Sequence, residues 1–163
     1  MLFQRMLRAA KLDVSLYEEV EHDKSASLQA ALVVLIATLL PAIGSILLHF
    51  NALHLAWMIV AYMLGWITFA FLTYIIGTKV FGGQADTGEM LRTLGFATTP
   101  MCLGIIPIVG AFIGGVWTIV TTVIAIRQGA DISTGKAIVT AILSVVAYIV
   151  IESLLGRLLI PVA

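Results

Sequence analysis

Long apolar runs, separated by short polar segments, constrain this chain more than any other feature of its sequence. A helix of about 20 apolar residues crosses a hydrocarbon core of roughly 30 Å. Five runs are candidates for such spans, and they cover residues 28–48, 55–78, 89–106, 109–127 and 137–160. Each is expected to be helical, because a lone strand in lipid would leave its backbone N–H and C=O groups unpaired. The sequence therefore predicts an all-α integral membrane protein with five transmembrane helices, preceded by a short amphipathic segment.

The composition supports the same fold class. Hydrophobic residues make up 61% of the chain and charged residues 11%, whereas about 25% of the residues in soluble domains are charged. A water-soluble chain of 163 residues could not bury so much apolar surface. The net charge is zero, which gives no electrostatic reason to expect nucleic acid as a partner. Membrane lipids are the partners that the composition predicts.

The positions of lysine and arginine predict the orientation in the membrane. With five spans, eight of the nine basic residues lie on one side and only Arg157 lies on the other. Lysine and arginine are enriched in cytoplasmic loops. We therefore expect a cytoplasmic N-terminus and a C-terminus on the outer side.

Residues 1–24 are expected to form cytoplasmic helices, ahead of a membrane domain at 25–163. The first helix is amphipathic, with Arg5 and Arg8 on its basic face, and such a helix can lie in the headgroup layer of an anionic leaflet. A second, acidic helix follows, with the spacing of a capping box at Ser15 and Glu18. These helices either dock a partner or lipid headgroups, or serve only as connectors.

The third run begins with a well-defined helix start. Asp86 and Glu89 have the spacing of a capping box, which predicts that a helix begins at Thr87, near the cytoplasmic face. Glu89 and Arg92 lie three residues apart, so they can pair on one side of that helix.

The same run is then interrupted. Pro100 removes the backbone donor that would bond the carbonyl of Phe96. The hydroxyls of Thr98 and Thr99, neighbouring helices or water can replace that donor. Gly95 lets another backbone approach closely. Two interpretations follow: a kink that fits the helix around its neighbours, or a polar pocket or gate open to the cytoplasm.

Three stretches together resemble a known family. They are "DKSASLQAALVV" at the first span, "GTKVFGGQADTGEMLRTLGFATTP" before and within the third, and "GVWTIVTTVIAIRQGADISTGKA" after it. In this order they are similar to the Ypt/Rab-interacting protein (YIP) family, and to its bacterial members in particular. The resemblance implies five helical spans, a cytoplasmic N-terminus and, for a bacterial member, the inner (plasma) membrane.

The family's eukaryotic members are associated with Rab-type GTPases and with vesicle traffic or membrane shaping. They carry an Asp-Leu-Tyr-Gly-Pro motif before the first span. This chain has "SLYEEV" at that place. The resemblance therefore implies the architecture of the family and not GTPase binding.

Three further positions are candidates for packing or function. Glu152 is the one carboxylate well inside a span, and a charged group there indicates a functional site by default. It is either part of a proton or ion pathway, or a glutamate near the outer interface that is protonated or bonded to a polar group such as His49 or His54 in the first outer loop. Gly110 and Gly114 lie four residues apart, which favours close helix packing inside the bundle or, as a second use, a homo-oligomer.

The sequence contains no paired-histidine metal motif, nucleophile elbow or Gly-rich phosphate loop, so we expect no enzyme and no cofactor or metal. Two functions remain. The first is a membrane scaffold or adaptor that engages a protein partner or lipid headgroups. Its cytoplasmic face is expected to include Arg5, Arg8, Asp86, Glu89 and Arg92. The second is a small oligomeric transporter or channel that uses the broken third span.

Overall fold

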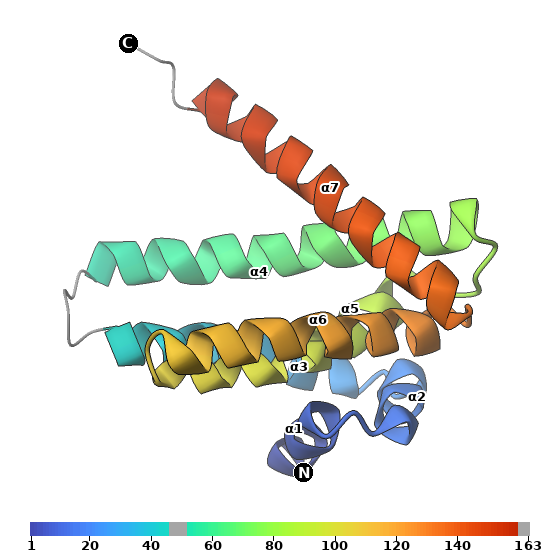
Figure 1. Ribbon diagram of the computed structural model, residues 1–163, viewed down its shortest axis with the longest axis horizontal. Coiled ribbons are helices and arrows are strands. Elements are labelled where there is room, and N and C mark those ends of the chain that lie inside the picture. Colours follow the sequence, from blue (N-terminus) through green and yellow to red (C-terminus); the bar gives the residue numbers. More distant parts are fainter. Residues whose placement is uncertain (46–51, 160–163) are drawn as a thin grey trace.

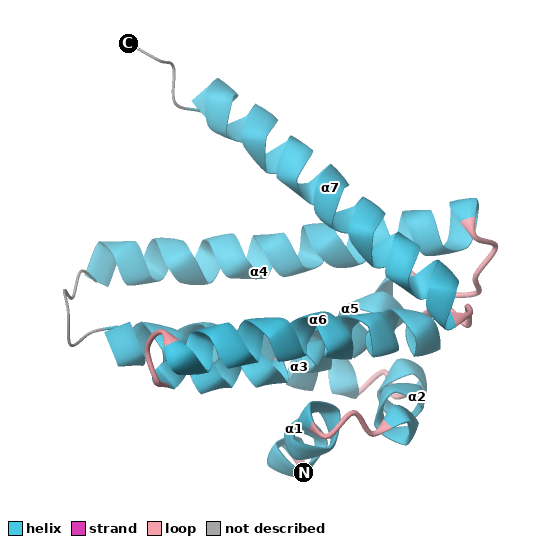
Figure 2. Cartoon of the chain, in the orientation of Figure 1, coloured by secondary structure: helices cyan, strands magenta, loops and turns pink. Residues whose placement is uncertain are grey.

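The computed structural model describes residues 1–45 and 52–159, and most of them are helical (Figure 2). In chain order the helices are α1 (Leu2–Ala10), α2 (Val14–His22), α3 (Ala26–Ser45), α4 (Ala52–Ile75), α5 (Thr87–Ala97), α6 (Val109–Gly129) and α7 (Thr134–Leu159). A π-helical turn, η1 (Ile76–Val80), extends α4, and a 3₁₀ segment, η2 (Thr99–Ile105), follows α5. No strand occurs in these described ranges, and the predicted all-α class is confirmed.

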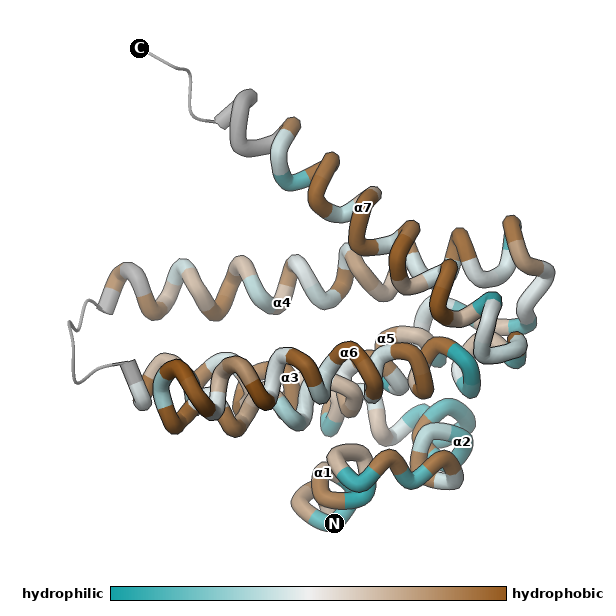
Figure 3. Tube along the Cα trace, viewed as in Figure 1, coloured by the Kyte–Doolittle hydropathy of each residue, from teal (hydrophilic) through white to brown (hydrophobic). Residues whose placement is uncertain are grey.

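Four of these helices are long and apolar enough to cross a membrane. The qualifying segments are Ala26–Gly44, Leu55–Val80, Val109–Gly129 and Thr134–Leu154. Apolar residues run along most of α6 and α7, whereas hydrophilic residues gather at α2 and the adjoining helix ends (Figure 3). The protein is therefore a multi-pass integral membrane protein. With 11 residues, α5 is too short to qualify by itself.

The segment formed by α5 and η2 packs against α3, α4 and α6 (Figure 1). Its glycines allow close contact with α3: a methyl group added at Gly95 would lie 2.7 Å from the Cβ of Ala30, and one added at Gly104 would lie 2.7 Å from the Cγ of Pro41. Gly95 precedes Gly104 in the sequence, just as Ala30 precedes Pro41 in α3, so the contacts occur in the same order along both elements. Thus α5 and η2 run beside α3, in the same direction, for most of its length.

The last helix leaves the bundle. In its first half α7 contacts α4 and α6, and it then diverges from both (Figure 1). Its buried positions in the described part of the chain are Ala137, Thr140 and Ser144, all within that first half.

The loops after η1 and after α6 lie at the same end of the bundle. The backbone N–H of Gln84 donates to the carbonyl of Ala130 at 3.0 Å. α2 packs beside this end, against both α5 and α6. The sequence predicts that this end lies in the cytoplasm, and we therefore call it the cytoplasmic cap; it comprises α2, residues 81–89 and residues 130–133.

The N-terminal helices are part of the core and not loose connectors. Leu16, Tyr17 and Val20 of α2 are fully buried, in one cluster with Met90 and Phe96 of α5. One prediction for α2, a capping box at Ser15 and Glu18, is wrong.

The capping residue of α2 is Asp13, whose carboxylate accepts the backbone N–H of Ser15 at 3.1 Å. The predicted capping box at Ser15 and Glu18 does not form. The helix already begins at Val14, and the backbone N–H of Ser15, which the carboxylate of Glu18 would accept in such a box, is bonded to Asp13.

Candidate functional site

The break in the third run is closed by threonine hydroxyls. α5 ends at Ala97, and the hydroxyl of Thr99 donates to the carbonyl of Phe96 at 2.7 Å. This is the carbonyl that Pro100 leaves without a backbone donor. The hydroxyl of Thr98 donates to Gly95 at 2.7 Å in the same way.

A third hydroxyl comes from another helix. Thr121 of α6 is fully buried and donates to the carbonyl of Ala97 at 2.7 Å. The sequence does not predict this contact, because nothing local to Thr121 indicates which helix faces the break. The carbonyls of Gly95, Phe96 and Ala97 therefore each accept a hydroxyl, and that of Gly95 also keeps the backbone N–H of Thr98 at 3.3 Å, as the apolar surroundings require.

Glycines hold η2 tightly against α6. A methyl group at Gly114 would lie 2.5 Å from the carbonyl oxygen of Pro100, and one at Gly110 would collide with the carbonyl of Leu103. Both predicted packing glycines thus lie at an internal contact between η2 and α6. The break is fixed in place by backbone contacts on both sides, since α3 covers its other face.

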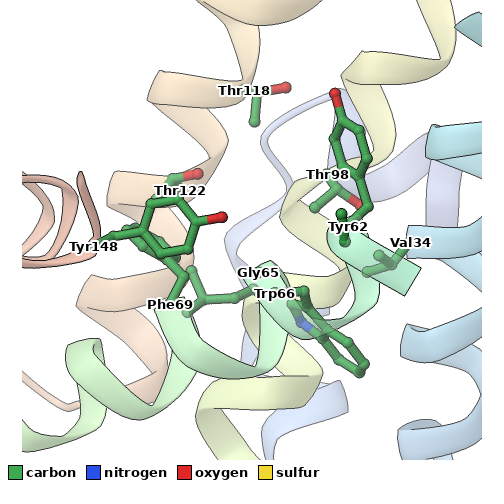
Figure 4. A pocket seen from close by; sticks show the side chains of 11 residues that line it. Val34, Tyr62, Gly65, Trp66, Phe69, Thr98, Thr118, Thr122 and Tyr148 are labelled. Atoms are coloured by element: carbon green, nitrogen blue, oxygen red, sulfur yellow. The ribbon is translucent and has the colours of Figure 1, made fainter. Parts of the chain in front are cut away.

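A cavity of about 340 Å³ lies in the middle of the bundle beside Thr98 (Figure 4). It is lined by residues from each of the helices from α3 to α7, and most of its wall is apolar and aromatic. Five hydroxyl-bearing side chains line it: Tyr62, Thr98, Thr118, Thr122 and Tyr148. No charged side chain is among the lining residues, so the cavity suits an uncharged ligand with hydrogen-bonding groups.

Thr99, the next residue, lines a different space. It lies on a groove between α1 and the outer surface of α3, η2 and α6. The break therefore separates a cavity that carries five hydroxyl groups from an apolar groove beside α1.

Arg92 connects the cytoplasmic cap to the bundle. Its side chain is 5% exposed, and its guanidinium donates to the carbonyl of Val20 at 2.9 Å and to the carbonyl of Glu21. These carbonyls are in the last turn of α2, where a positive charge is favoured by the helix dipole. The predicted pairing of Arg92 with Glu89 is wrong. The carboxylate of Glu89 instead completes the predicted capping box, accepting the N–H of Asp86 at 2.6 Å.

The basic residues of α1 are engaged within the protein. Arg5 forms ion pairs with Glu19 at 2.7 Å and Asp23 at 2.8 Å. Arg8 forms ion pairs with Asp13 at 2.7 Å and Glu19 at 2.5 Å. The two arginines therefore join α1 to α2.

The pKa values of these carboxyl groups follow from their bonds. The hydroxyl of Ser15 and then Arg8 lower the pKa of Asp13 to about 2. Arg8 and Arg5 lower the pKa of Glu19. These groups remain charged at any physiological pH.

Glu21 behaves in the opposite way. It is 5% exposed, and burial raises its pKa to about 7, with a further contribution from the negative charge of Asp131. Glu89 and Glu18 add to this effect, whereas His22 opposes it. Carboxylates from α2, α5 and the loop after α6 therefore converge at the cytoplasmic cap.

Glu152 does not join either space beside the break. It is exposed on the divergent part of α7, and it hydrogen-bonds Tyr148 one turn earlier. The partners that the sequence suggested, His49 and the side chain of His54, lie outside the part of the chain that the structure describes. Within the residues that the structure describes, no three His, Cys, Asp or Glu side chains gather in a way that could hold a metal ion.

Comparison with known proteins identifies the family. The Yip1 domain matches residues 15–154, which is most of the chain. Neither the curated proteins nor the solved structures gave a match. The matched region runs from α2 to the exposed part of α7, so it includes the cytoplasmic cap, the break and the central cavity. The chain therefore belongs to the Yip1 domain family.

Proposed function

We propose that this protein is a non-enzymatic membrane scaffold or adaptor that binds a partner at its cytoplasmic cap. The observation that carries the proposal is the buried contact of Arg92 with the last turn of α2. This contact joins α5 to α2, and the bond from the N–H of Gln84 to the carbonyl of Ala130 holds the loop after α6 at the same end. A preformed surface binds a partner without the entropic cost of ordering mobile segments.

The charge of the cap favours a basic partner. Glu18, Asp86 and Asp131 are exposed there, and Glu18 and Asp131 lie close enough to Glu21 to raise its pKa. A positively charged protein segment complements such a surface. Lipid headgroups fit it less well, because the two arginines of α1 are already paired with carboxylates.

Site-specific photo-crosslinking in native membranes tests the proposal. A photoreactive residue at Asp131 is expected to give one reproducible protein adduct, which weakens when Glu18 is replaced by lysine. The control position is Phe112, which is 73% exposed on the lipid-facing side of α6. Adducts of equal yield at both positions, or none at Asp131, would contradict an adaptor role for the cap.

The central cavity supports a second candidate function, transport of a small solute. Its hydroxyl-lined wall beside Thr98 is the specific observation in its favour. Flux through proteoliposomes that falls in Thr98→Val or Glu152→Gln variants, while a Thr134→Val control is unaffected, would support transport. Absence of flux for protons, ions and small neutral solutes would leave the adaptor function.

We further propose that α5 and η2 together form a fifth span, with the N-terminus in the cytoplasm and the C-terminus outside. An α-helix of 11 residues and a 3₁₀ segment of 7 have a combined length of about 30 Å, which is close to the hydrocarbon thickness. The bond between Gln84 and Ala130 supports this, because it brings the ends of α4 and α6 to one side. For a bacterial member, that orientation corresponds to the inner membrane.

A further inference from the structure

An apolar groove of about 610 Å³ lies between the N-terminal helix and the bundle. Met6 and Leu7 of α1 form one wall. Leu40 of α3, Leu103 of η2 and Ile113 of α6 are among the residues of the opposite wall. The groove therefore exists only because α1 is held over the broken segment.

The groove does not require a ligand that forms hydrogen bonds. Its two strong hydrogen-bonding side chains are Thr99 and Trp117, and both are already satisfied inside the protein. Thr99 donates to Phe96, and the indole N–H of Trp117 donates to the carbonyl of Ala10 at 2.7 Å. An occupant is therefore apolar.

The depth of the groove in the membrane follows from α3. The guanidinium of Arg5 donates to the side chain of Gln29 at 3.1 Å, which fixes α1 at the level of the first turn of α3. Ile36 and Leu40 lie 7 and 11 residues further along that helix, or roughly 10 and 16 Å deeper at 1.5 Å per residue. The groove thus runs from the cytoplasmic boundary towards the middle of the bilayer.

One cation is available beside α1. Arg5 and Arg8 are paired with carboxylates, whereas Lys11 is exposed and makes no ion pair with the part of the chain that the structure describes. Lys11 follows Ala10, which lines the groove, and it therefore lies beside the end of α1 that Trp117 holds.

We propose that the groove binds one acyl chain of a phospholipid from the cytoplasmic leaflet, with the lipid phosphate beside Lys11. The inference rests on the cytoplasmic N-terminus proposed above. An acyl chain matches the apolar wall and the direction of the groove, and a phosphate is the group that a lysine at the membrane surface attracts. α1 then retains a single lipid against the break.

Native mass spectrometry of the purified protein tests the retention of lipid. The wild type is expected to keep one phospholipid per chain after detergent washing. Leu103→Trp fills the groove and is expected to lower the retained fraction at least five-fold. Ile105→Trp is the matched control, because both residues lie on η2, both are 44% exposed, and Ile105 does not line the groove. Equal retention in the two variants would overturn the proposal.

A fluorescence measurement tests the site without filling it. A protein that keeps only Trp117 is reconstituted in a phosphate-free glycolipid with a small fraction of brominated phosphatidylglycerol or phosphatidylethanolamine. Bromine on the acyl chains should quench Trp117 more strongly than it quenches a protein that keeps only Trp57, which is 67% exposed on α4. Lys11→Gln is expected to weaken the binding of the brominated lipid, measured by this quenching, by roughly five-fold, since one lysine near the membrane surface contributes about 1 kcal/mol to the binding of an anionic lipid group.

Equal quenching of the two tryptophans would overturn the proposal, as would quenching of Trp117 that Lys11→Gln leaves unchanged. The adaptor function is tested independently of the lipid groove. Loss of the adduct at Asp131 with lipid retention intact would contradict the adaptor alone, and loss of retention with the adduct intact would contradict the groove alone.

Discussion

A buried arginine and a buried glutamate meet at the junction between α2 and the bundle, and they do not pair with each other. The guanidinium of Arg92 bonds the backbone carbonyl of Glu21, not its carboxylate. The carboxyl group of Glu21 is instead surrounded by other negative charges, and burial disfavours its ionised form. The junction is therefore most stable when Glu21 carries a proton.

Glu21 should make the stability of the protein depend on pH. Its folded pKa is raised to about 7, above the ordinary value of 4.5. The stabilisation of the folded state by the protonated carboxyl group of Glu21 is therefore complete below pH 4.5 and is lost as the pH rises to 7. In the Glu21→Gln variant this loss is absent. The melting temperature of the variant relative to the wild type should rise between pH 5 and pH 7 and level off above pH 7, as measured by thermal unfolding in detergent.

Asp13 and Asp23 serve as the internal reference for this experiment. Their pKa values are lowered to about 2, so neither group titrates between pH 5 and pH 8. An Asp23→Asn variant should thus differ from the wild type by the same amount across that range. A Glu21→Gln variant that also showed a constant difference would contradict the proposed role of Glu21.

The broken element shows how side-chain hydroxyls replace a missing backbone donor. Thr99→Val removes the donor to the Phe96 carbonyl, and an unsatisfied buried carbonyl costs about 1–3 kcal/mol. Thr118→Val is the matched control, because its hydroxyl bonds the Gly114 carbonyl in the regular part of α6. That carbonyl keeps its helical donor. Thermal unfolding should show a clear loss for Thr99→Val and little change for Thr118→Val; equal losses would mean that the hydroxyl of Thr99 is not needed at the break.

The contact between η2 and α6 can be tested with two adjacent glycines. A methyl group at Gly114 meets backbone atoms of Pro100 and Met101, which cannot move without shifting η2. A methyl group at Gly115 meets nothing within 4 Å. Gly114→Ala is expected to destabilise the protein by about 1–3 kcal/mol, whereas Gly115→Ala should be neutral or gain up to about 1 kcal/mol from helix propensity. Unfolding curves of the two variants in the same detergent provide the measurement.

Local patterns in the sequence predict the elements well where the bonding partners are close along the chain. The capping box of Asp86 and Glu89 forms as expected, and α5 begins at Thr87. The replacement of the lost donor at Phe96 by Thr99 also follows from three neighbouring residues. The capping box at Ser15 fails for a local reason too, because Asp13 competes for the same backbone donor.

Long-range contacts set the limit of such predictions at the scale of the whole molecule. The partners of Arg92 are 71 and 72 residues away, and the indole of Trp117 reaches a carbonyl 107 residues away. Sequence spacing instead suggests Glu89, the nearest carboxylate, as the partner of Arg92. The cavity beside Thr98 and the groove beside Thr99 also arise from helices that are distant in sequence, so no local pattern marks them.

The topology of the whole molecule depends on whether the chain between α4 and α6 crosses the membrane. If it does, Gln84 and Asp131 face the same side and Ile108 faces the other; if it does not, Gln84 and Asp131 lie on opposite sides. All three residues are exposed, so single cysteines there, in a Cys102→Ser background, can react with a membrane-impermeant maleimide.

Five spans predict that Ile108→Cys is labelled in intact cells, and that Gln84→Cys and Asp131→Cys react only after permeabilisation. The structure gives a physical reason to expect this pattern, because the backbone bond from Gln84 to Ala130 could not form across a bilayer. Labelling of Asp131→Cys but not Gln84→Cys in intact cells would place the two loops on opposite sides. The cytoplasmic cap would then not be a single surface, since the loop after α6 would be separated from α2 by the membrane.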